Sequence, residues 1–520
     1  MDFRFLRIAA AAALLLSSFT LSAQGVKIRV ASQSDFDALQ TTVEEAVKKG
    51  GRDVVVDFAS GTYYYKEGHL SFYKKYYDNV SLSLTGNGEV VLTAGGNDSS
   101  VRKCRKNKAV RWQWEFNPES AYLSSGEPLD FNAPVRYAQS RVEILDMASK
   151  ACRVRLAEAP DPSVAGEAYI WISQWFRGNS YKITKVEGEY VYFTADDLRT
   201  TEKGPSIDSD WGYASVLPRY RLINSGNEVY VRDGMVRYGR KAPLHECTAS
   251  TFLSVRGSHL KSLTLSNLRF EGNGGRRGES KLCALDLYCS KIGKTDISRC
   301  VFKYMKTDCI RIVQVGDVSV TRCIFKDCWR GCVFSDVASL RTRVEENNID
   351  DCGLCGDNIT AIQCKGEDFL VSRNVLKDFG YGGIASGVHY AAGKDSKVSG
   401  TISSNTLYYS REYYEDAPMN LLMDSGAIYF TTQNDDVTVR DNVIHDISGP
   451  KDNRGIFLDD GASNIKVFGN QVRNIMNSYT IDSRRVKSVE TRSDSKIRKV
   501  NVGNEIHDND TDGKVRFEKR

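Results

Sequence analysis

The chain has 520 residues, of which 71 are basic and 66 acidic, so its formal net charge is only +5. A balance this close to neutral does not indicate a nucleic-acid-binding protein. The length exceeds one ordinary domain, which leaves either several domains or a repeat protein that grows along one axis.

Residues 1–23 have the composition of a secretory signal peptide. Arg4 and Arg7 precede an apolar run, and Leu21-Ser22-Ala23 forms a small-residue cleavage site. No cysteine follows that could carry a lipid anchor, and no other apolar run approaches the roughly 18 residues of a membrane span. We therefore expect an exported protein, periplasmic or extracellular, without a membrane anchor.

Residues 24–96 are predicted to form an N-terminal cap and the first turns of a repeat. The apolar spacing from Ser34 to Lys49 predicts a short amphipathic helix, with Ser34 as N-cap and Gly50-Gly51 ending it. Short β-prone runs follow (VVVDF, VSLSLTG, VVLTAG). A helix at this position would cover the open edge of a β-structure.

Residues 97–244 interrupt the repeat. The runs RVEILDM, CRVRLAE and EAYIWIS stand at hairpin-like spacing, which predicts a small inserted antiparallel β domain. Five of the six tryptophans fall in this segment: Trp112, Trp114, Trp171, Trp175 and Trp211. Exposed aromatic planes can stack on sugar rings, but packing in the core of the insert is the preferred interpretation.

Residues 245–520 repeat a short β-prone run, then an Asn or small residue, then an apolar pair. One register aligns Leu268, Cys300, Cys323, Asn347, Asn374, Asn405, Asn442, Asn470 and Asn504. A second inward series holds Met305, Cys328, Cys352, Phe379, Ile447 and Ile475, and a third run follows in DCIRI, GCVF, GGIAS, SGAIYF and RGIFL. Three strands per coil predict an all-β fold, a right-handed parallel β-helix, with Asn side chains hydrogen-bonded from coil to coil.

Two other repeat architectures fit less well. Leucine-rich or helical solenoids would show a 3.6-residue apolar period between the runs, whereas these runs are rich in Val, Ile, Thr and Phe. A β-propeller would need hairpin dipeptides between its strands, and few fall where they should.

Thirteen cysteines in an exported protein would ordinarily suggest disulfides. Their positions argue against it, because Cys300 with Cys323 and Cys328 with Cys352 occupy equivalent sites on adjacent coils. Such thiols would stack as small buried hydrophobes. The alternative is zinc held by Cys352, Cys355 and Cys364, which lacks a second tight pair of ligands.

Acidic side chains gather at the ends of the third strand of each coil. Asp424 precedes GAIYF, Asp459-Asp460 follow GIFL, and Asp336 and His389 occupy comparable exits on earlier coils. Alternation places Tyr429, Phe457 and Asp459 on the outer face, where we expect the carboxylates to point into solvent. Paired carboxylates suit glycosidic bond cleavage, so Asp424, Asp459 and Asp460 are candidate catalytic residues and Asp336, His389 and Tyr429 candidate substrate contacts. Asp-Asp is also common turn chemistry, as Asp435-Asp436 illustrates.

The pairing of a GAIY strand with a following GIFLDDG strand resembles the parallel β-helix glycoside hydrolases with xylosidase- and fucosidase-type members. The segments SQWFRGNSYKITKVEGEYVYF and TFLSVRGSHLKSLTLSNLRFEGN are similar to the inserted domain and re-entry of that group. The resemblance implies exo-acting hydrolysis of a poly- or oligosaccharide, with the functional acids on Asp424 and on Asp459 or Asp460, and without a cofactor.

Two other functions stay open at this point. A polysaccharide lyase would neutralise a uronate with Ca²⁺ or Arg and use a basic residue as base, for which Lys365, Arg373 and Arg454 are available. A non-catalytic glycan-binding protein is the third, since fold alone does not determine function. Neither alternative involves nucleic acid.

Overall fold

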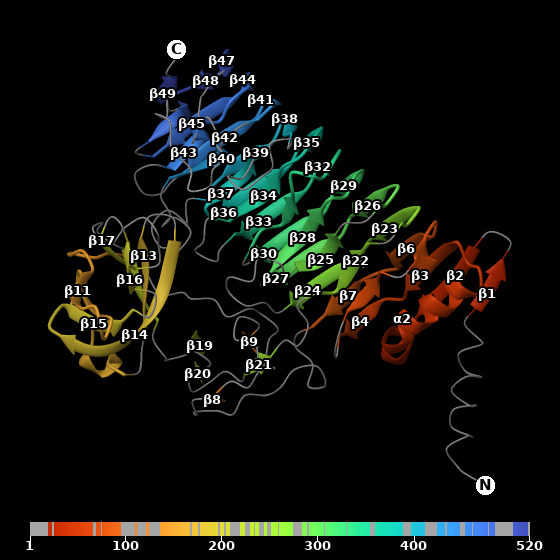
Figure 1. Cartoon of the computed structure of the whole chain (residues 1–520), viewed down its shortest axis with the longest axis horizontal. Coiled ribbons are helices and arrows are strands. Elements are labelled where there is room, and N and C mark those ends of the chain that lie inside the picture. Colours follow the sequence, from red (N-terminus) through yellow and green to blue (C-terminus); the bar gives the residue numbers. More distant parts are fainter. Residues whose placement is uncertain are drawn as a thin grey trace, which may run out of the picture.

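The computed structural model shows a long β-helix with a separate β domain lying beside it (Figure 1). The structure describes residues 19–22, 25–94, 110–111, 121–123, 136–207, 219–223, 229–232, 235–238, 244–246 and 251–517, with internal gaps. The longer gaps are 66–68, 274–282, 354–358, 388–396, 411–423, 448–452 and 484–502, and the shorter ones are 74, 167–168, 175–176, 196–197, 202–203, 258, 289–290, 306, 329, 432–433, 460 and 477.

Three parallel sheets run the length of the helix, and we name them A, B and C. Sheet A has the order β1 (Phe19–Ser22), β2 (Gly25–Val30), β3 (Asp53–Phe58), β6 (Ser81–Gly86), β23 (Ser262–Ser266), β26 (Thr295–Ser298), β29 (Val318–Thr321), β32 (Arg343–Glu345), β35 (Phe369–Ser372), β38 (Ser399–Ser403), β41 (Asp436–Arg440), β44 (Ile465–Phe468) and β47 (Glu505–His507). Within this sheet β1 alone pairs antiparallel, with β2.

The other two sheets have the same stacked order. Sheet B contains β4 (Gly61–Tyr64), β7 (Val90–Thr93), β24 (Arg269–Asn273), β27 (Val301–Met305), β30 (Ile324–Cys328), β33 (Asn348–Cys352), β36 (Val375–Phe379), β39 (Thr406–Tyr408), β42 (Val443–Ile447), β45 (Gln471–Ile475) and β48 (Asp510–Thr511). Sheet C contains β5 (Leu70–Phe72), β22 (Leu253–Arg256), β25 (Cys283–Tyr288), β28 (Asp308–Val313), β31 (Val333–Ser335), β34 (Thr360–Cys364), β37 (Gly382–Ser386), β40 (Ser425–Thr431), β43 (Asn453–Asp459), β46 (Tyr479–Ser483) and β49 (Lys514–Phe517). Each coil thus contributes one strand to each sheet, as the sequence predicted.

The bend from sheet A to sheet B is built in the same way on every coil from β23 to β47. The residue after the sheet A strand has a left-handed backbone with φ between 51° and 67°. These residues are Asn267, Arg299, Arg322, Glu346, Arg373, Ser404, Asp441, Gly469 and Asp508. The next residue belongs to the predicted register on each of these coils except the last, where it is Asn509. A non-glycine residue in this conformation is strained, so neighbouring coils must hold it there.

Asparagine side chains supply that support on the later coils. The Asn374 amide donates to Oδ1 of Asn405 at 2.9 Å and to the Val344 carbonyl at 2.8 Å, while its own Oδ1 accepts from Asn347. Asn405, Asn442 and Asn470 repeat the pattern. The predicted ladder is therefore confirmed.

The last member of the ladder was predicted wrongly. Asn470 donates to Asn509, whereas Asn504 accepts a hydrogen bond from the backbone of Ile465 at another corner. Both asparagines follow short β-prone runs, and the spacing alone does not tell these two corners apart.

The interior of the coils is dry and continuous. Inward residues from the three sheets form one cluster that extends from Val26 to Ile481. Phe270, Phe302 and Phe325 stack along it, with ring centroids 5.1 and 5.0 Å apart. The nine cysteines that the structure describes are free and buried, which agrees with the stacked-thiol prediction over this part of the chain.

The N-terminal end is covered by helix α2 (Gln33–Lys48), whose apolar face packs on the first coils. The sequence placed the N-cap at Ser34, but the structure places it at Ser32, whose hydroxyl accepts from the backbone of Asp35 at 3.2 Å. Both are serines within three residues of Asp35, so composition did not separate them. Gly50 follows the helix at φ +99°, as a C-terminal glycine should.

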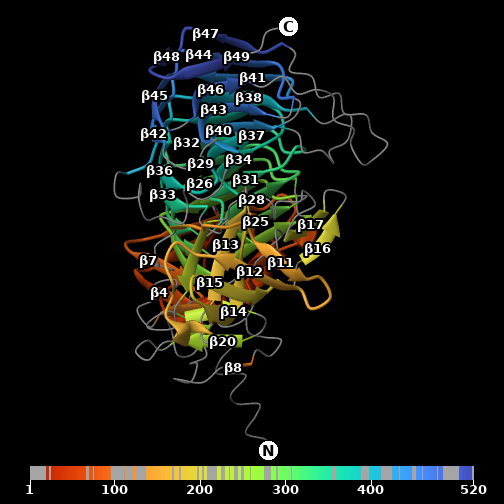
Figure 2. The same ribbon diagram turned by 90° about the vertical axis from the view of Figure 1, so that its left-hand side faces the viewer.

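The inserted domain has its own sheet and its own core. The order is β10 (Arg136–Tyr137), β18 (Arg219–Ile223), β13 (Tyr169–Gln174), β14 (Arg177–Glu187), β15 (Tyr190–Thr194), β12 (Ala151–Arg155) and β11 (Glu143–Asp146), and the pairs are antiparallel. Figure 2 shows this sheet in front of the middle coils. Trp171 lies on β13. Trp112, Trp114, Trp175 and Trp211 lie outside the described residues.

Shorter elements complete the described chain. They are β8 (Val110–Arg111), β9 (Ala121–Leu123), β16 (Leu198–Thr201), β17 (Gly204–Ile207), β19 (Val229–Arg232), β20 (Met235–Tyr238), β21 (Leu244–Glu246) and the 3-10 turns Lys75–Tyr77 and Pro162–Val164. Among the described segments, no helix has the length and apolar character needed to cross a membrane.

Replacing Asn374 by Ala should lower the free energy of unfolding by about 2–4 kcal/mol, because it leaves buried amide and carbonyl groups of three coils without partners. Asn348, exposed on β33 of the preceding coil, is the matched control, and its Ala variant should change stability by less than about 0.5 kcal/mol. Denaturant unfolding of both variants measures the difference. Equal effects would show that the amide ladder does not stabilise the bend.

The described cysteines from Cys283 to Cys364 should resist alkylation in the folded protein and react fully in denaturant without reductant. Burial raises the pKa of the thiols of Cys309, Cys332 and Cys352, which disfavours the reactive thiolate. Counting labelled cysteines by mass spectrometry before and after denaturation tests this. A disulfide-linked peptide from this region would contradict it.

Candidate active site on sheet C

The outer face of sheet C presents a row of side chains that includes Tyr429, one of the three predicted contacts. Tyr429 on β40 lies opposite Phe457 on β43, which lies opposite Asp482 on β46 and then Arg516 on β49. Their neighbours Ile428 and Ile456 belong to the interior cluster. Alternation along the strands therefore places this row outside the core, as the period of two predicts.

Asp424 stands at the start of β40, where the chain enters the sheet. Its backbone is left-handed with φ 62°, and its carbonyl oxygen accepts a hydrogen bond from the Tyr381 hydroxyl at 2.5 Å. Its carboxylate accepts from Nη1 of Arg454 at 3.2 Å. Tyr381 thus fixes the backbone of Asp424 and Arg454 fixes its carboxylate, and 21% of the side chain stays exposed.

Arg454 is the central cation of the site, and its side chain is fully buried. Besides Asp424 it binds Oδ2 of Asp482 through Nε at 2.9 Å, and its guanidinium lies 3.9 Å from the centre of the Phe457 ring. A charge this deep is stable only because it is paired and hydrogen-bonded.

Asp482 and Arg516 extend the network, and sequence reasoning missed both. Arg516 binds the fully buried Asp482 carboxylate through two nitrogens, each at 2.6 Å. The signal was present in YTIDS, which is the next third-strand run after RGIFL. Continuing the register by one coil would have placed Asp482 beside Phe457.

Asp459 ends β43 and is joined to the same site by tyrosines. The Tyr429 hydroxyl donates to its Oδ2 at 3.1 Å, and the Tyr381 and Tyr429 rings meet edge to face at 5.7 Å. Burial, together with the charges of Asp424 and Asp459, raises the pKa of both tyrosines well above the usual value. They therefore stay neutral and act as hydrogen-bond donors at physiological pH.

Asp424 and Asp459 come from opposite ends of neighbouring strands, yet the Tyr381–Tyr429 pair contacts both. The expectation that these carboxylates point freely into solvent is wrong for Asp459, which is only 7% exposed because the tyrosine covers it. Asp460 and His389 lie outside the described residues.

Asp336 lies at the exit of β31, on an earlier coil, and does not belong to this cluster. Its Oδ1 accepts from the backbone of Gln314 at 3.0 Å and from the Ser339 hydroxyl at 2.7 Å. It faces Lys365, the residue at the end of β34.

The three basic residues considered for a lyase occupy different environments. Arg373 lies at the bend between sheets A and B, where it pairs with Glu345 and Glu346. Arg454 is held between two carboxylates. Of the three, only Lys365 both adjoins a strand of sheet C and has a lowered pKa. Burial lowers the pKa of Lys365 to about 8, and the charge of Asp336 partly offsets this effect.

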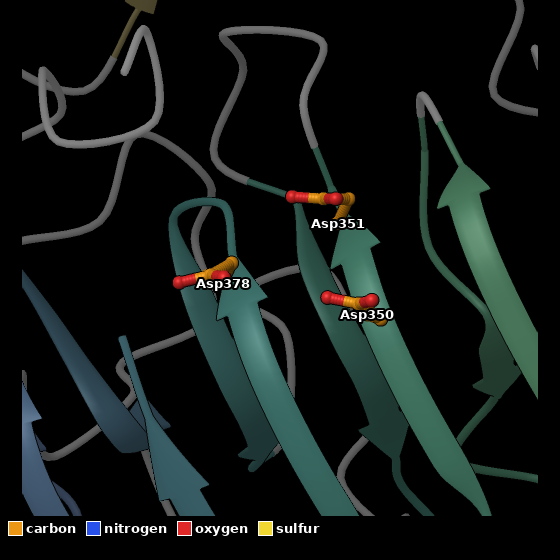
Figure 3. A group of neighbouring side chains, drawn as sticks. All are labelled: Asp350, Asp351 and Asp378. Carbon is orange, nitrogen blue, oxygen red and sulfur yellow. The ribbon is translucent and has the colours of Figure 1, made fainter. Parts of the chain in front are cut away.

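A cluster of three acids lies on sheet B. Asp350 and Asp351 on β33 and Asp378 on β36 bring carboxylate oxygens within 4.8 Å of one another (Figure 3). Lys377 lies 3.5 Å from Asp350 and 3.3 Å from Asp378, so it already balances part of this charge. Ser410 donates twice to Asp378. Its strands belong to sheet B, whereas Asp424 precedes a strand of sheet C, so the cluster is not part of the Asp424 site.

The zinc alternative gains no support from the described residues. Cys352 and Cys364 are buried and free, while Cys355 lies outside the described part of the chain. Within that part, the group of side chains placed to hold one ion consists of Asp350, Asp351 and Asp378 and includes neither Cys352 nor Cys364.

The fold agrees with comparisons to known proteins. Residues 252–413 and 360–502 match the family model described as the right handed beta helix region. A solved structure named as a glycoside hydrolase has a TM-score of 0.59 at 12% identity, covering 93% of this chain and 96% of that one. No curated protein matches the sequence.

Two exopolygalacturonases share the architecture more loosely. The one from Thermotoga maritima has a TM-score of 0.36 at 10% identity, covering 90% of this chain and 91% of its own. The family 28 enzyme from Yersinia enterocolitica has 0.33 at 11%, covering 94% and 78%. The three parallel sheets and the family match make the chain a right-handed parallel β-helix, and its fold is similar to that of the structure named as a glycoside hydrolase.

Replacing Arg454 by Met should lower the free energy of unfolding by about 3 kcal/mol, because it removes one partner from a buried carboxylate. Arg440, exposed and paired with Asp441, is the control, and its Met variant should change stability by less than about 0.5 kcal/mol. Chemical denaturation measures both. Equal stabilities for the two variants would mean that the buried network does not support the site.

Proposed function

We propose that the protein is an exported glycoside hydrolase that cleaves a poly- or oligosaccharide at the Asp424–Asp459 site. The observation that carries the proposal is that one pair of neutral tyrosines contacts two acidic residues, the backbone carbonyl of Asp424 through Tyr381 and the carboxylate of Asp459 through Tyr429, and that the charges of both acids act on both tyrosines. Glycosidic bond cleavage needs two acids with different tasks near one bond.

The surroundings of the two acids differ in the required way. Asp424 touches the Arg454 guanidinium, and an adjacent cation stabilises the carboxylate form. We assign it the role of nucleophile or of base toward water. Asp459 is only 7% exposed, and the Tyr429 hydroxyl orients its Oδ2. We assign it, or its neighbour Asp460, the role of acid toward the leaving oxygen.

Tyr429 contributes the substrate contact that the sequence predicted. Its hydroxyl orients Asp459, and its ring packs against Phe457 at 5.4 Å. Because it is only partly buried, it offers an aromatic edge to a sugar at the same place as the acid. His389 stays a proposed contact, and no cofactor is invoked.

The names of the similar structures and the N-terminal sequence support this proposal. The structure with the TM-score of 0.59 is named as a glycoside hydrolase. Export is inferred from residues 1–23, which have signal-peptide composition, and a polymeric glycan would be met outside the cytoplasm.

Asp424→Asn and Asp459→Asn should each lower the rate of glycan cleavage by at least about a thousandfold, because each removes one of the two acids. Comparison of Asp460→Asn with Asp459→Asn shows which of the two adjacent residues acts as the acid toward the leaving oxygen. Asp424→Asn should leave the melting temperature nearly unchanged, since that side chain is partly exposed. The assay is product release from a panel of plant and host glycans.

Asp436→Asn is the control, because Asp436 is exposed at the start of β41 and should be dispensable. Full activity in Asp424→Asn, Asp459→Asn and Asp460→Asn would refute the assignment. An unsaturated product from the wild type that disappears with chelator would instead identify a lyase.

A further inference from the structure

Four side chains of alternating charge form one series of contacts from the proposed active site to the last strand of sheet C. Asp424 accepts a hydrogen bond from Nη1 of Arg454 at 3.2 Å, and Nε of Arg454 donates to Oδ2 of Asp482 at 2.9 Å. Arg516, on β49, donates to both oxygens of Asp482 at 2.6 Å. Arg454 and Asp482, the two inner members, thus each lie between two groups of opposite charge, and the four formal charges cancel.

The Asp482 carboxylate is where the two cations share one anion. Its side chain is fully buried, so solvent screens its charge little. Two of the three hydrogen bonds just described come from Arg516. Without them the Asp482 charge would be less balanced and would attract the Arg454 guanidinium more strongly, away from Asp424.

The fold fixes Arg516 in this position. Strand pairing places it directly opposite Asp482, on the third strand beyond β40. Its guanidinium lies 4.4 Å from the centre of the Tyr479 ring, and 29% of the side chain is exposed. The register of sheet C therefore decides that a cation reaches Asp482 from the side opposite β43.

Several titratable groups act on Asp424 besides this network. Burial, and then the charges of Asp424 and Asp459, raise the pKa of Tyr381 and Tyr429 well above the usual value. Both tyrosines therefore stay neutral over the pH range in which carboxyl groups titrate. Among the described residues, the charged and titratable groups that act on Asp424 directly or through Arg454 are Arg454, Tyr381, Tyr429, Asp459, Asp482 and Arg516.

We propose that Arg516 is a positioning residue for the reaction: by holding Asp482, it leaves Arg454 in contact with Asp424 and keeps that carboxylate ionised at acidic pH. The inference rests on the proposed function for the role of Asp424, whereas the contacts that transmit the effect do not involve substrate. Removing one cation makes the network more negative by one charge, which favours a protonated carboxyl group. The ionised form of Asp424 should then be lost at a higher pH.

The first test is the pH dependence of kcat/KM for glycan cleavage. In Arg516→Met the acidic limb should move to higher pH by about half a unit or more, because the cation and both of its hydrogen bonds are lost. Arg516→Lys keeps the charge but not the paired hydrogen bonds, so its limb should lie between the two. Arg473→Met is the control, since Arg473 pairs with Asp510 on sheet B, and its limb should coincide with that of the wild type.

An acidic limb that stays in place in Arg516→Met would overturn the inference. A fall in kcat/KM by the same factor at every pH would do so too, because it would indicate a structural role alone. Arg516→Gln, which keeps a hydrogen-bond donor without the charge, carries the same prediction and is used where the Met variant does not fold.

A double-mutant cycle tests the coupling without activity. Denaturant midpoints at neutral pH are compared for the wild type, Arg516→Met, Asp424→Asn and the double variant. In the Asn background Arg454 and Asp482 remain as a balanced pair, so Arg516→Met should lower the midpoint less than it does in the wild type. Additive changes would contradict the inference and leave the hydrolase proposal standing. Coupling in a protein that cleaves no glycan of the panel would contradict the hydrolase proposal and leave the coupling of Arg516 to Asp424 standing.

Discussion

The hydrogen bonds between successive coils are the constraint on which the rest of this structure depends. No single strand of two to seven residues can bury a face alone, and the left-handed bend before each ladder residue is unfavourable in isolation. The asparagine amides bind the coil above and the coil below, which keeps the bend and sets the register. That register decides which side chains share the outer row of sheet C.

The site depends on this register twice. Tyr429, Phe457, Asp482 and Arg516 meet because they lie opposite one another on four neighbouring strands. Arg454 then joins this row to Asp424, since it binds Asp424 and Asp482 and stacks on Phe457. A one-residue shift in any of these strands would turn the polar row into the core. The buried charges therefore contribute specificity of arrangement rather than much net stability.

Sequence periodicity was sufficient to predict the parallel β-helix, the inward series and the outward positions of Tyr429 and Asp459. Each of these follows from the alternation of side chains along a strand and from the constant order of strands in a coil. The ladder ended at Asn509 instead of Asn504 since two corners carry similar residues. Contacts between side chains of different coils could not be predicted from the spacing of residues. The burial of Asp459 under Tyr429 and the engagement of Arg454 by two acids depend on side-chain directions that the spacing of residues does not contain.

Reaction of the wild-type protein with a cleavable glycan in heavy-oxygen water tests the central claim most directly. Hydrolysis at Asp424 and Asp459 incorporates one solvent oxygen for every bond broken, so mass spectrometry should find one heavy oxygen in the new reducing end of each product. Products that carry an unsaturated sugar and no solvent oxygen would contradict hydrolysis and show elimination instead.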